Sequence, residues 1–166
     1  MRLVVGLDFD RGAWPGPLSS RDSALGESWV GPLGFLEVLE TALGLGGRFA
    51  SDVVRAASLV PAIQSIDGFW SASARVDPVA TAERLLAWRD SLRLCGWRGD
   101  GGAWRLRTLA AVTAGVSPGV ADRLEVVTNV LACRAADVDE VVLHEPKGWA
   151  PAWRRVLEGW AAAERA

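Results

Sequence analysis

The stretch that most clearly decides the fold runs from Phe69 to Trp97 and reads FWSASARVDPVATAERLLAWRDSLRLCGW. Asp77 is suited to cap a helix, because its carboxylate can accept hydrogen bonds from the first backbone N–H groups of the next turn. Pro78 suits the first helical position, where its missing N–H costs nothing, and Gly96 supplies a stop about five turns later. The sequence therefore predicts a helix that begins at Pro78 and ends just before Gly96.

The apolar residues of this predicted helix form a stripe along one side. They are spaced at i, i+4, i+7, i+11 and i+14, and they are Thr81, Leu85, Trp88, Leu92 and Cys95. The other side carries Glu83, Arg84, Ala87, Asp90 and Ser91. This period is typical of a helix that packs against a core with one side and faces solvent with the other. We therefore expect the stripe to be buried.

Similar patterns outside this stretch predict the remaining elements. Helices are expected at about 32–43, at 51–63 with Pro61 ending or kinking the helix, at 103–114, at 118–133 after a Ser117 cap, and from Pro151 onward. Short apolar runs at 2–8 and 139–143 predict strands, whereas residues 14–28 are rich in Pro, Gly and Ser and predict a loop. The fold class is therefore a helix-rich α/β fold, with about six helices around a small parallel sheet of two or three strands.

Composition indicates one domain over residues 1–166. The chain is 50% hydrophobic with a net charge of −2, so it is expected to bury roughly 70% of its unfolded surface and shows no overall electrostatic footprint for nucleic acid. The uncharged run at 108–121 contains Gly and Pro and is too short to cross a membrane. Cys95 and Cys133 are expected to be buried thiols in a reducing compartment, and the absence of a signal-like segment favours the cytoplasm.

One pair of carboxylates invites an enzymatic interpretation. Asp8 and Asp10 follow the first predicted strand, at the place where open α/β sheets bind their ligands. A strand followed by D-x-D resembles the first motif of haloacid-dehalogenase-type phosphatases, in which one carboxylate attacks phosphorus and the other moves a proton, with Mg²⁺ bound nearby. The competing interpretation is that both aspartates end a strand and solvate a turn.

Other catalytic patterns are missing or incomplete. The first strand is not followed by G-x-x-x-x-G-K-[ST], and no lysine occurs before Lys147, which excludes Walker-type ATP binding at that strand. His144 is the only histidine and no G-x-S-x-G occurs, so neither triad catalysis nor a zinc site is expected. Glu145, Pro146 and Lys147 spell half of a PD-(D/E)XK nuclease motif, but proline is rare within a paired strand. We expect no catalytic, cofactor or metal site.

Five stretches together carry a resemblance to a known family. They are FWSASARVDPVATAERLLAWRDSLRLCGW at 69–97, GPLGFLEVLETALGL at 31–45, RLRTLAAV at 105–112, PGVADRLEVV at 118–127 and HEPKGWAPAWRRVLEGW at 144–160. They resemble the N-terminal region of large bacterial proteins of the PD-(D/E)XK nuclease family, which are similar to the B subunit of the ATP-dependent helicase/deoxyribonuclease. The resemblance covers nearly the whole chain, but none of its stretches is catalytic.

The resemblance implies a role on DNA ends in recombination and repair. The chain is expected to be the non-catalytic, inactivated helicase-like N-terminal domain of a longer protein, with a scaffolding or DNA-guiding role. Its expected partners are the remainder of the helicase/nuclease polypeptide or a partner subunit, and DNA. Arg105, Arg107, Arg154 and Arg155 are the candidate DNA contacts, since guanidinium groups suit phosphates. A solvated helix face is the competing interpretation for each arginine.

A third hypothesis assigns the chain to protein–protein interaction. Tryptophan is enriched at the energetic centres of interfaces, and the chain has nine tryptophans. Trp149 and Trp153 are then the expected exposed anchors.

Overall fold

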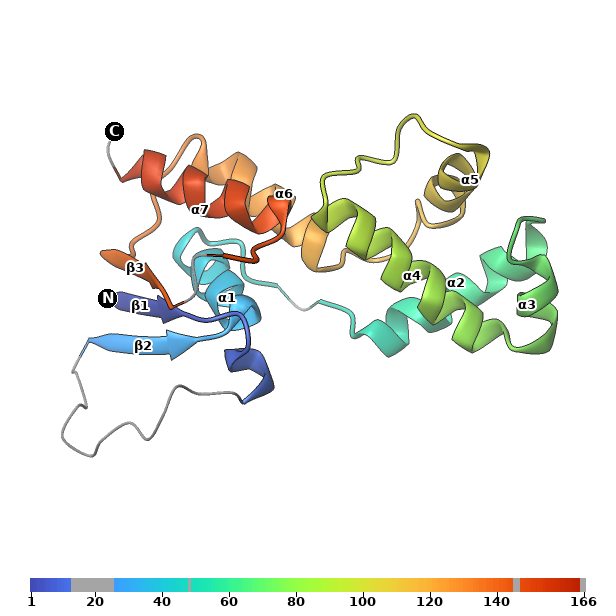
Figure 1. Ribbon diagram of the computed structural model, residues 1–166, viewed down its shortest axis with the longest axis horizontal. Coiled ribbons are helices and arrows are strands. Elements are labelled where there is room, and N and C mark those ends of the chain that lie inside the picture. Colours follow the sequence, from blue (N-terminus) through green and yellow to red (C-terminus); the bar gives the residue numbers. More distant parts are fainter. Residues whose placement is uncertain (13–25, 48, 145–146, 165–166) are drawn as a thin grey trace. The chain divides into compact units, whose positions relative to one another are not determined.

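The computed structural model describes residues 1–12, 26–47, 49–144 and 147–164. These residues form one three-stranded parallel sheet and seven α-helices, which confirms the predicted helix-rich α/β class (Figure 1). The strands are β1 (Arg2–Val5), β2 (Glu27–Val30) and β3 (Glu140–Leu143). The helices are α1 (Pro32–Ala42), α2 (Asp52–Ser65), α3 (Ser71–Val76), α4 (Pro78–Leu94), α5 (Trp104–Val112), α6 (Val120–Leu131) and α7 (Pro151–Ala163). Among them, none combines the length and apolar character that crossing a bilayer requires.

The chain divides into two compact units. The sheet unit comprises Met1–Gly47 and Leu124–Ala166, and the helical unit comprises Arg48–Arg123. The helical unit is therefore an insertion in the sequence between β2 and β3, and the boundary falls within α6. That the two units behave as a single domain, as the sequence indicates, stays a prediction.

The sheet has the order β2-β1-β3, with β1 paired in parallel to both neighbours (Figure 1). Leu3 and Val5 are fully buried, as the apolar run predicts for a central strand. The expected strand at 139–143 is confirmed as β3. The predicted loop at 14–28 was wrong at its end, because Glu27 and Ser28 belong to β2; residues 13–25 lie outside the described part of the chain.

α1 begins as predicted, with Pro32 in its first turn. The preceding residue, Gly31, has no side chain to cap the helix, and the carboxylate of Asp10 instead accepts a hydrogen bond from the N–H of Leu33 at 2.8 Å. A Cβ at Gly31 would overlap that carboxylate. α1 contacts β1 and β2, and its fully buried side chains Phe35, Leu36 and Leu39 stabilise the sheet unit by roughly 1.5–3 kcal/mol each.

The last helix, α7, also begins at its predicted proline, Pro151. Trp149 and Trp153 meet edge to face there, with ring centroids 5.9 Å apart, and their exposed fractions are 3% and 7%. The expectation that these two tryptophans are exposed anchors was wrong. They lie in the core of the sheet unit, one just before α7 and one in its first turn, because large indole rings bury much apolar area.

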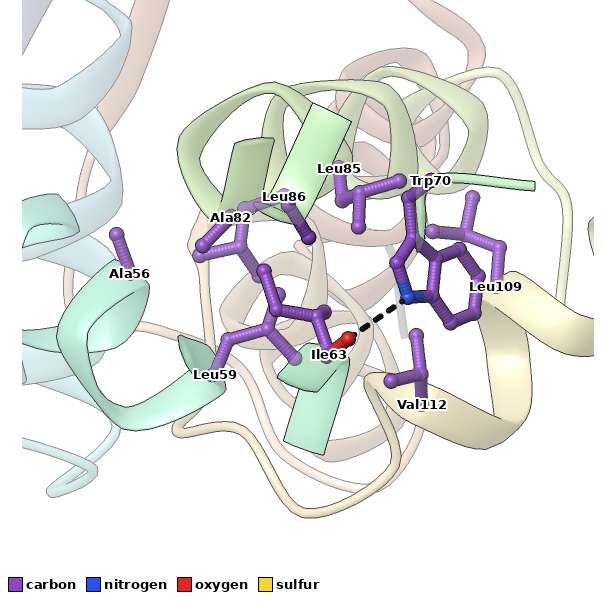
Figure 2. Close-up of a cluster of buried hydrophobic side chains, with 10 residues drawn as sticks. Ala56, Leu59, Ile63, Trp70, Ala82, Leu85, Leu86, Leu109 and Val112 are labelled. Carbon is purple, nitrogen blue, oxygen red and sulfur yellow. Dashed lines mark hydrogen bonds between the residues drawn. The ribbon is translucent and has the colours of Figure 1, made fainter. Parts of the chain in front are cut away.

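The helical unit has its own apolar core, to which α2, α3, α4 and α5 contribute. α2 packs chiefly against α4, through residues that include Leu59, Ile63, Leu85 and Leu86 (Figure 2). The indole of Trp70 closes this core, and its N–H donates to the carbonyl of Ile63 at 3.2 Å. A buried indole with a satisfied N–H fixes the end of α2 against the start of α3.

Several helix boundaries differ slightly from the prediction, among them the end of α2 and the start of α6. α2 is capped by the side chain of Ser51, and it continues through Pro61 to Ser65, whereas the sequence predicts an end or kink at Pro61. α6 begins at Val120, not at Pro118, and the carboxylate of Asp122 accepts from the N–H of Gly119 at 2.8 Å. The Ser-Pro signal was misleading because an aspartate inside the first turn satisfies the donor near the start of α6.

Candidate functional site

Two neighbouring clefts lie along α4 in the helical unit. The α4/α5 cleft has a volume of about 450 Å³, within the range of small-ligand pockets, and the α3/α4 cleft has about 250 Å³. The α4/α5 cleft is lined by Phe69, Trp88, Ser91, Leu92, Cys95, Arg105, Leu106 and Leu109. The α3/α4 cleft is lined by Phe69, Trp70, Ser73, Ala80, Thr81, Arg84, Leu85 and Trp88.

The apolar stripe predicted for α4 forms the walls of these clefts. The helix itself is confirmed, with the N–H of Ala80 donating to the Asp77 carboxylate at 3.0 Å. The prediction that the whole stripe is buried was wrong: Trp88 is 49% exposed, Cys95 is exposed, and Leu85 is the stripe residue in the core. The buried side is rotated and consists of Ala82, Leu85, Leu86 and Arg89. α4 therefore leaves part of its apolar stripe, at Trp88 and Cys95, open to ligands.

Three aromatic rings and one guanidinium group dominate the open surface. Phe69 and Trp88 stack with their planes at 22° and centroids 6.3 Å apart, and Trp104 meets Phe69 edge to face at 6.0 Å. The guanidinium of Arg105 lies 5.6 Å from the Phe69 ring centroid and 5.9 Å from that of Trp104. Trp104 is 53% exposed, so these contacts hold the arginine beside a ring that ligands can reach.

The floor of the clefts is the core of the helical unit. Leu109 lines the α4/α5 cleft and Leu85 and Trp70 line the α3/α4 cleft, and all three belong to the packed core in Figure 2. Side chains in such a core occupy fixed rotamers. The clefts are thus preformed surfaces on a packed support.

A buried network of charges holds α4 in place from the side opposite its open stripe. Arg55 on α2, which is 3% exposed, donates to both carboxylate oxygens of Asp90, at 2.7 and 3.1 Å. It also donates to the backbone carbonyl of Ser117 at 3.0 Å. Arg89 donates to both oxygens of Asp122 at 2.9 and 3.0 Å. α4 is therefore tied by forked hydrogen bonds to α2 and to the start of α6.

The network raises the pKa of its two buried arginines and lowers the pKa of Asp122. Burial alone would lower the pKa of Arg55 and Arg89, but hydrogen bonds and charge from Asp90 and Asp122 outweigh it and raise both. Burial would raise the pKa of Asp122, but hydrogen bonds from Arg89 and from the N–H of Gly119 bring it below its ordinary value. These arginines are occupied inside the protein and are not available to a ligand.

The two units carry opposite net charge. Residues 48–123 contain ten arginines and seven acidic residues, a net charge of +3, whereas the sheet unit has eight basic and thirteen acidic residues, a net charge of −5. Among the described residues that line the two clefts, none is acidic and two are arginines, Arg84 and Arg105. Both are exposed, and neither has an ion-pair partner in the described ranges. The clefts therefore favour an anionic ligand with apolar parts.

The four arginines predicted as DNA contacts fall in different places. Arg105 and Arg107 lie on α5 in the helical unit, whereas Arg154 and Arg155 are exposed on α7 in the sheet unit. Arg105 lines the α4/α5 cleft, and Arg107 donates to the carbonyl of Gly102 at 2.7 Å. Four residues of this site were not predicted from the sequence: Phe69, Arg84, Trp88 and Trp104. Only Trp88 had a signal in the sequence, its place in the apolar stripe of α4, and that stripe was interpreted as part of the core.

The other candidates from the sequence do not form a comparable site. Asp10 caps α1, and Asp8 pairs with Arg11 at 3.4 Å on the surface. His144 is exposed beside the rings of Phe9 and Trp29. Among the described residues, no group of three His, Cys, Asp or Glu is placed to hold a metal ion.

Two further expectations concern the nuclease half-motif and the thiols. Glu145 and Pro146 lie outside the described residues, so the expectation that the half-motif ending at Lys147 is not a catalytic site stays a prediction. The expectation of buried thiols was wrong: Cys95 and Cys133 are both exposed, because each follows the end of its helix.

Comparison of the chain with models of protein families, with curated proteins and with solved structures finds no match in any of the three.

Proposed function

We propose that this chain is a non-catalytic, inactivated helicase-like module of a DNA end-processing helicase/nuclease in recombination and repair, and that its helical unit guides DNA. The observation that supports this proposal is the position of Arg105: its guanidinium lies over the rings of Phe69 and Trp104, and the residue lines an apolar cleft. Arginine beside exposed aromatic rings is the combination that proteins use to follow a nucleic-acid strand.

Charge supports DNA over a neutral or cationic partner. The helical unit has a net charge of +3, and its cleft arginines, Arg84 and Arg105, are free of internal ion pairs among the described residues. Guanidinium groups bind phosphate oxygens through charge-assisted hydrogen bonds. We assign the phosphate contacts to these two arginines. The scaffolding role, through the remainder of a larger polypeptide or a partner subunit, belongs to the same proposal.

The test is salt-dependent binding of the whole chain to labelled single-stranded and forked DNA. We expect binding at ~50 mM salt that weakens steeply by ~200 mM, because each phosphate contact releases counterions. The double variant Arg84→Glu with Arg105→Glu is expected to reduce affinity more than tenfold and to make the salt dependence shallower by about 0.7 per lost contact on single strands.

The matched control is Arg154→Glu with Arg155→Glu, which makes the same change of charge on exposed α7 arginines of the sheet unit. We expect it to weaken binding less than the cleft variant does. Equal losses from both pairs would show that net charge, not the cleft, governs binding. No binding of either DNA at ~50 mM salt would contradict the proposed function, since phosphate contacts are strongest there.

A further inference from the structure

We infer that the α4/α5 cleft receives unpaired bases of single-stranded DNA, and that the helical unit therefore distinguishes a single strand from a duplex. This inference rests on the proposed function and specifies the ligand of the same site. Its occupant is a strand whose bases are free to leave the stack, with bases on the aromatic rings and phosphates on Arg84 and Arg105.

The chemistry of the α4/α5 cleft suits exposed bases. Six of its eight lining side chains are apolar or aromatic or carry a thiol, and the polar ones are Ser91 and Arg105. The phosphate backbone alone offers nothing to an apolar surface, whereas every base has a flat face that stacks on an aromatic ring. In a duplex, those faces are covered by neighbouring base pairs.

The ring of Trp88 lines both clefts and is stacked on Phe69, so it stands between the two hollows with half of its surface exposed. Arg105 lies on the α4/α5 side and Arg84 on the α3/α4 side. A strand that stacks a base on Trp88 therefore has a cation for phosphate in each adjoining cleft.

The surface is rigid enough to select between a single strand and a duplex. Leu109 and Leu85, beneath the two clefts, are each 2% exposed, and α4 is fixed from behind by Arg55 and Asp90. A preformed aromatic surface loses little side-chain entropy on binding. Stacking of a base on these rings can therefore increase the affinity, because little of its free energy is used to order the side chains.

The experiment compares two strands with the same phosphates. One probe is a labelled oligothymidylate of about 12 nucleotides, and the other is a strand of equal length with abasic sugars throughout. We expect the thymidylate to bind the whole chain more tightly. Trp88→Ala is expected to weaken thymidylate binding by about 5- to 150-fold, the range for one stacked base, and to leave binding of the abasic strand unchanged. Trp88→Phe should retain most of the affinity.

The matched control is Phe49→Ala in the same unit. Phe49 is 40% exposed and carries the guanidinium of Arg123 at 4.1 Å from its ring centroid, but it does not line either cleft. We expect this change to leave the preference for thymidylate intact. Thermal unfolding of each variant checks that Trp88, which is half exposed, can be replaced without loss of the fold.

Cysteine labelling gives a second measurement. Cys95 lines the cleft and Cys133 is an exposed thiol in the sheet unit, so bound thymidylate should slow the reaction of a maleimide with Cys95 and not with Cys133. Equal binding of both strands, with no effect of Trp88→Ala, would overturn the inference and leave the proposed DNA-guiding function standing. Protection of Cys95 by an apolar helical peptide but not by thymidylate would also overturn it, and would assign the cleft to a protein. Absence of binding by either strand would overturn inference and proposed function together.

Discussion

The central strand of the sheet unit and the longest helix of the helical unit differ in how far their apolar side chains are covered. In the sheet unit, β1 lies between two strands and Leu3 and Val5 are completely buried. In the helical unit, α4 buries Arg89 on its inner side and leaves Trp88 half exposed. An apolar pattern therefore shows which side chains share one side of a strand or helix. The number of neighbouring elements decides whether that side is buried.

The two units also differ in how their interiors are held. The sheet unit is centred on apolar side chains of β1 and α1. The helical unit joins α2, α4 and the start of α6 through a network of charged residues that includes Arg55, Asp90, Arg89 and Asp122. Because these charges fix the inner side of α4, its apolar side is left free for binding. The comparison predicts that the helical unit is the more sensitive to loss of a charge and to acid.

The largest expected effect is that of Arg55→Ala. Removing this guanidinium leaves the Asp90 carboxylate partly buried without its forked donor, and the carbonyl of Ser117 without its partner. We expect a loss of about 3–5 kcal/mol in the free energy of unfolding, measured by chemical denaturation. Arg75→Ala is the control, since Arg75 is exposed in the same unit and should change stability by at most about 0.5 kcal/mol. Similar losses of unfolding free energy for both variants would contradict the view that the buried ion pairs stabilise the helical unit.

The second effect is dependence on pH through Asp122. Its pKa in the folded protein lies below the ordinary value, so its contribution is present above that value, about 4, and is lost as the pH falls through the folded pKa. Asp122→Asn is expected to lower the free energy of unfolding by about 1–3 kcal/mol near pH 7. The difference in free energy of unfolding between the wild-type protein and Asp122→Asn should become smaller toward pH ~3. Urea unfolding at both pH values measures it. A constant difference would contradict the assignment.

The smallest effect tests the sheet unit. Asp10→Ala removes the acceptor for the N–H of Leu33 at the start of α1 and should cost about 1 kcal/mol in thermal or chemical unfolding. Asp8→Ala removes only an exposed ion pair and should change stability by less than that. A phosphatase would behave differently, because hydrolysis of a generic phosphate ester would then disappear in Asp8→Asn while stability stayed unchanged.

Most helix boundaries could be predicted because their signals are local. Asp77 and Pro78, Pro32 and Pro151 mark helix starts by chemistry that acts within one turn, and all three starts are confirmed. β2 was not predicted because two of its four residues, ESWV, are polar. These residues form a strand by pairing with β1. A paired strand depends on a distant partner, which no local pattern contains.

The candidate site was predictable in part. Arg105 was named from the chemistry of phosphate binding, but Trp88 was assigned to the core because periodicity does not show which neighbours a helix has. The buried pairs of Arg55 with Asp90 and of Arg89 with Asp122 join residues 35 and 33 positions apart. Together with Ala82, Leu85 and Leu86 they hold α4 in the orientation that leaves Trp88 half exposed.

The insertion of the helical unit between β2 and β3 has a consequence for biosynthesis. β1 is translated before both of its partners, and the second partner, residues 140–143, follows only after the helical unit has been synthesised. Until then one edge of β1 offers unpaired amides and carbonyls to any passing strand, which is the usual origin of aggregation in nascent chains. Translation products that stop before residue 140 should therefore be prone to precipitate, while residues 48–123 have already been synthesised in one continuous run.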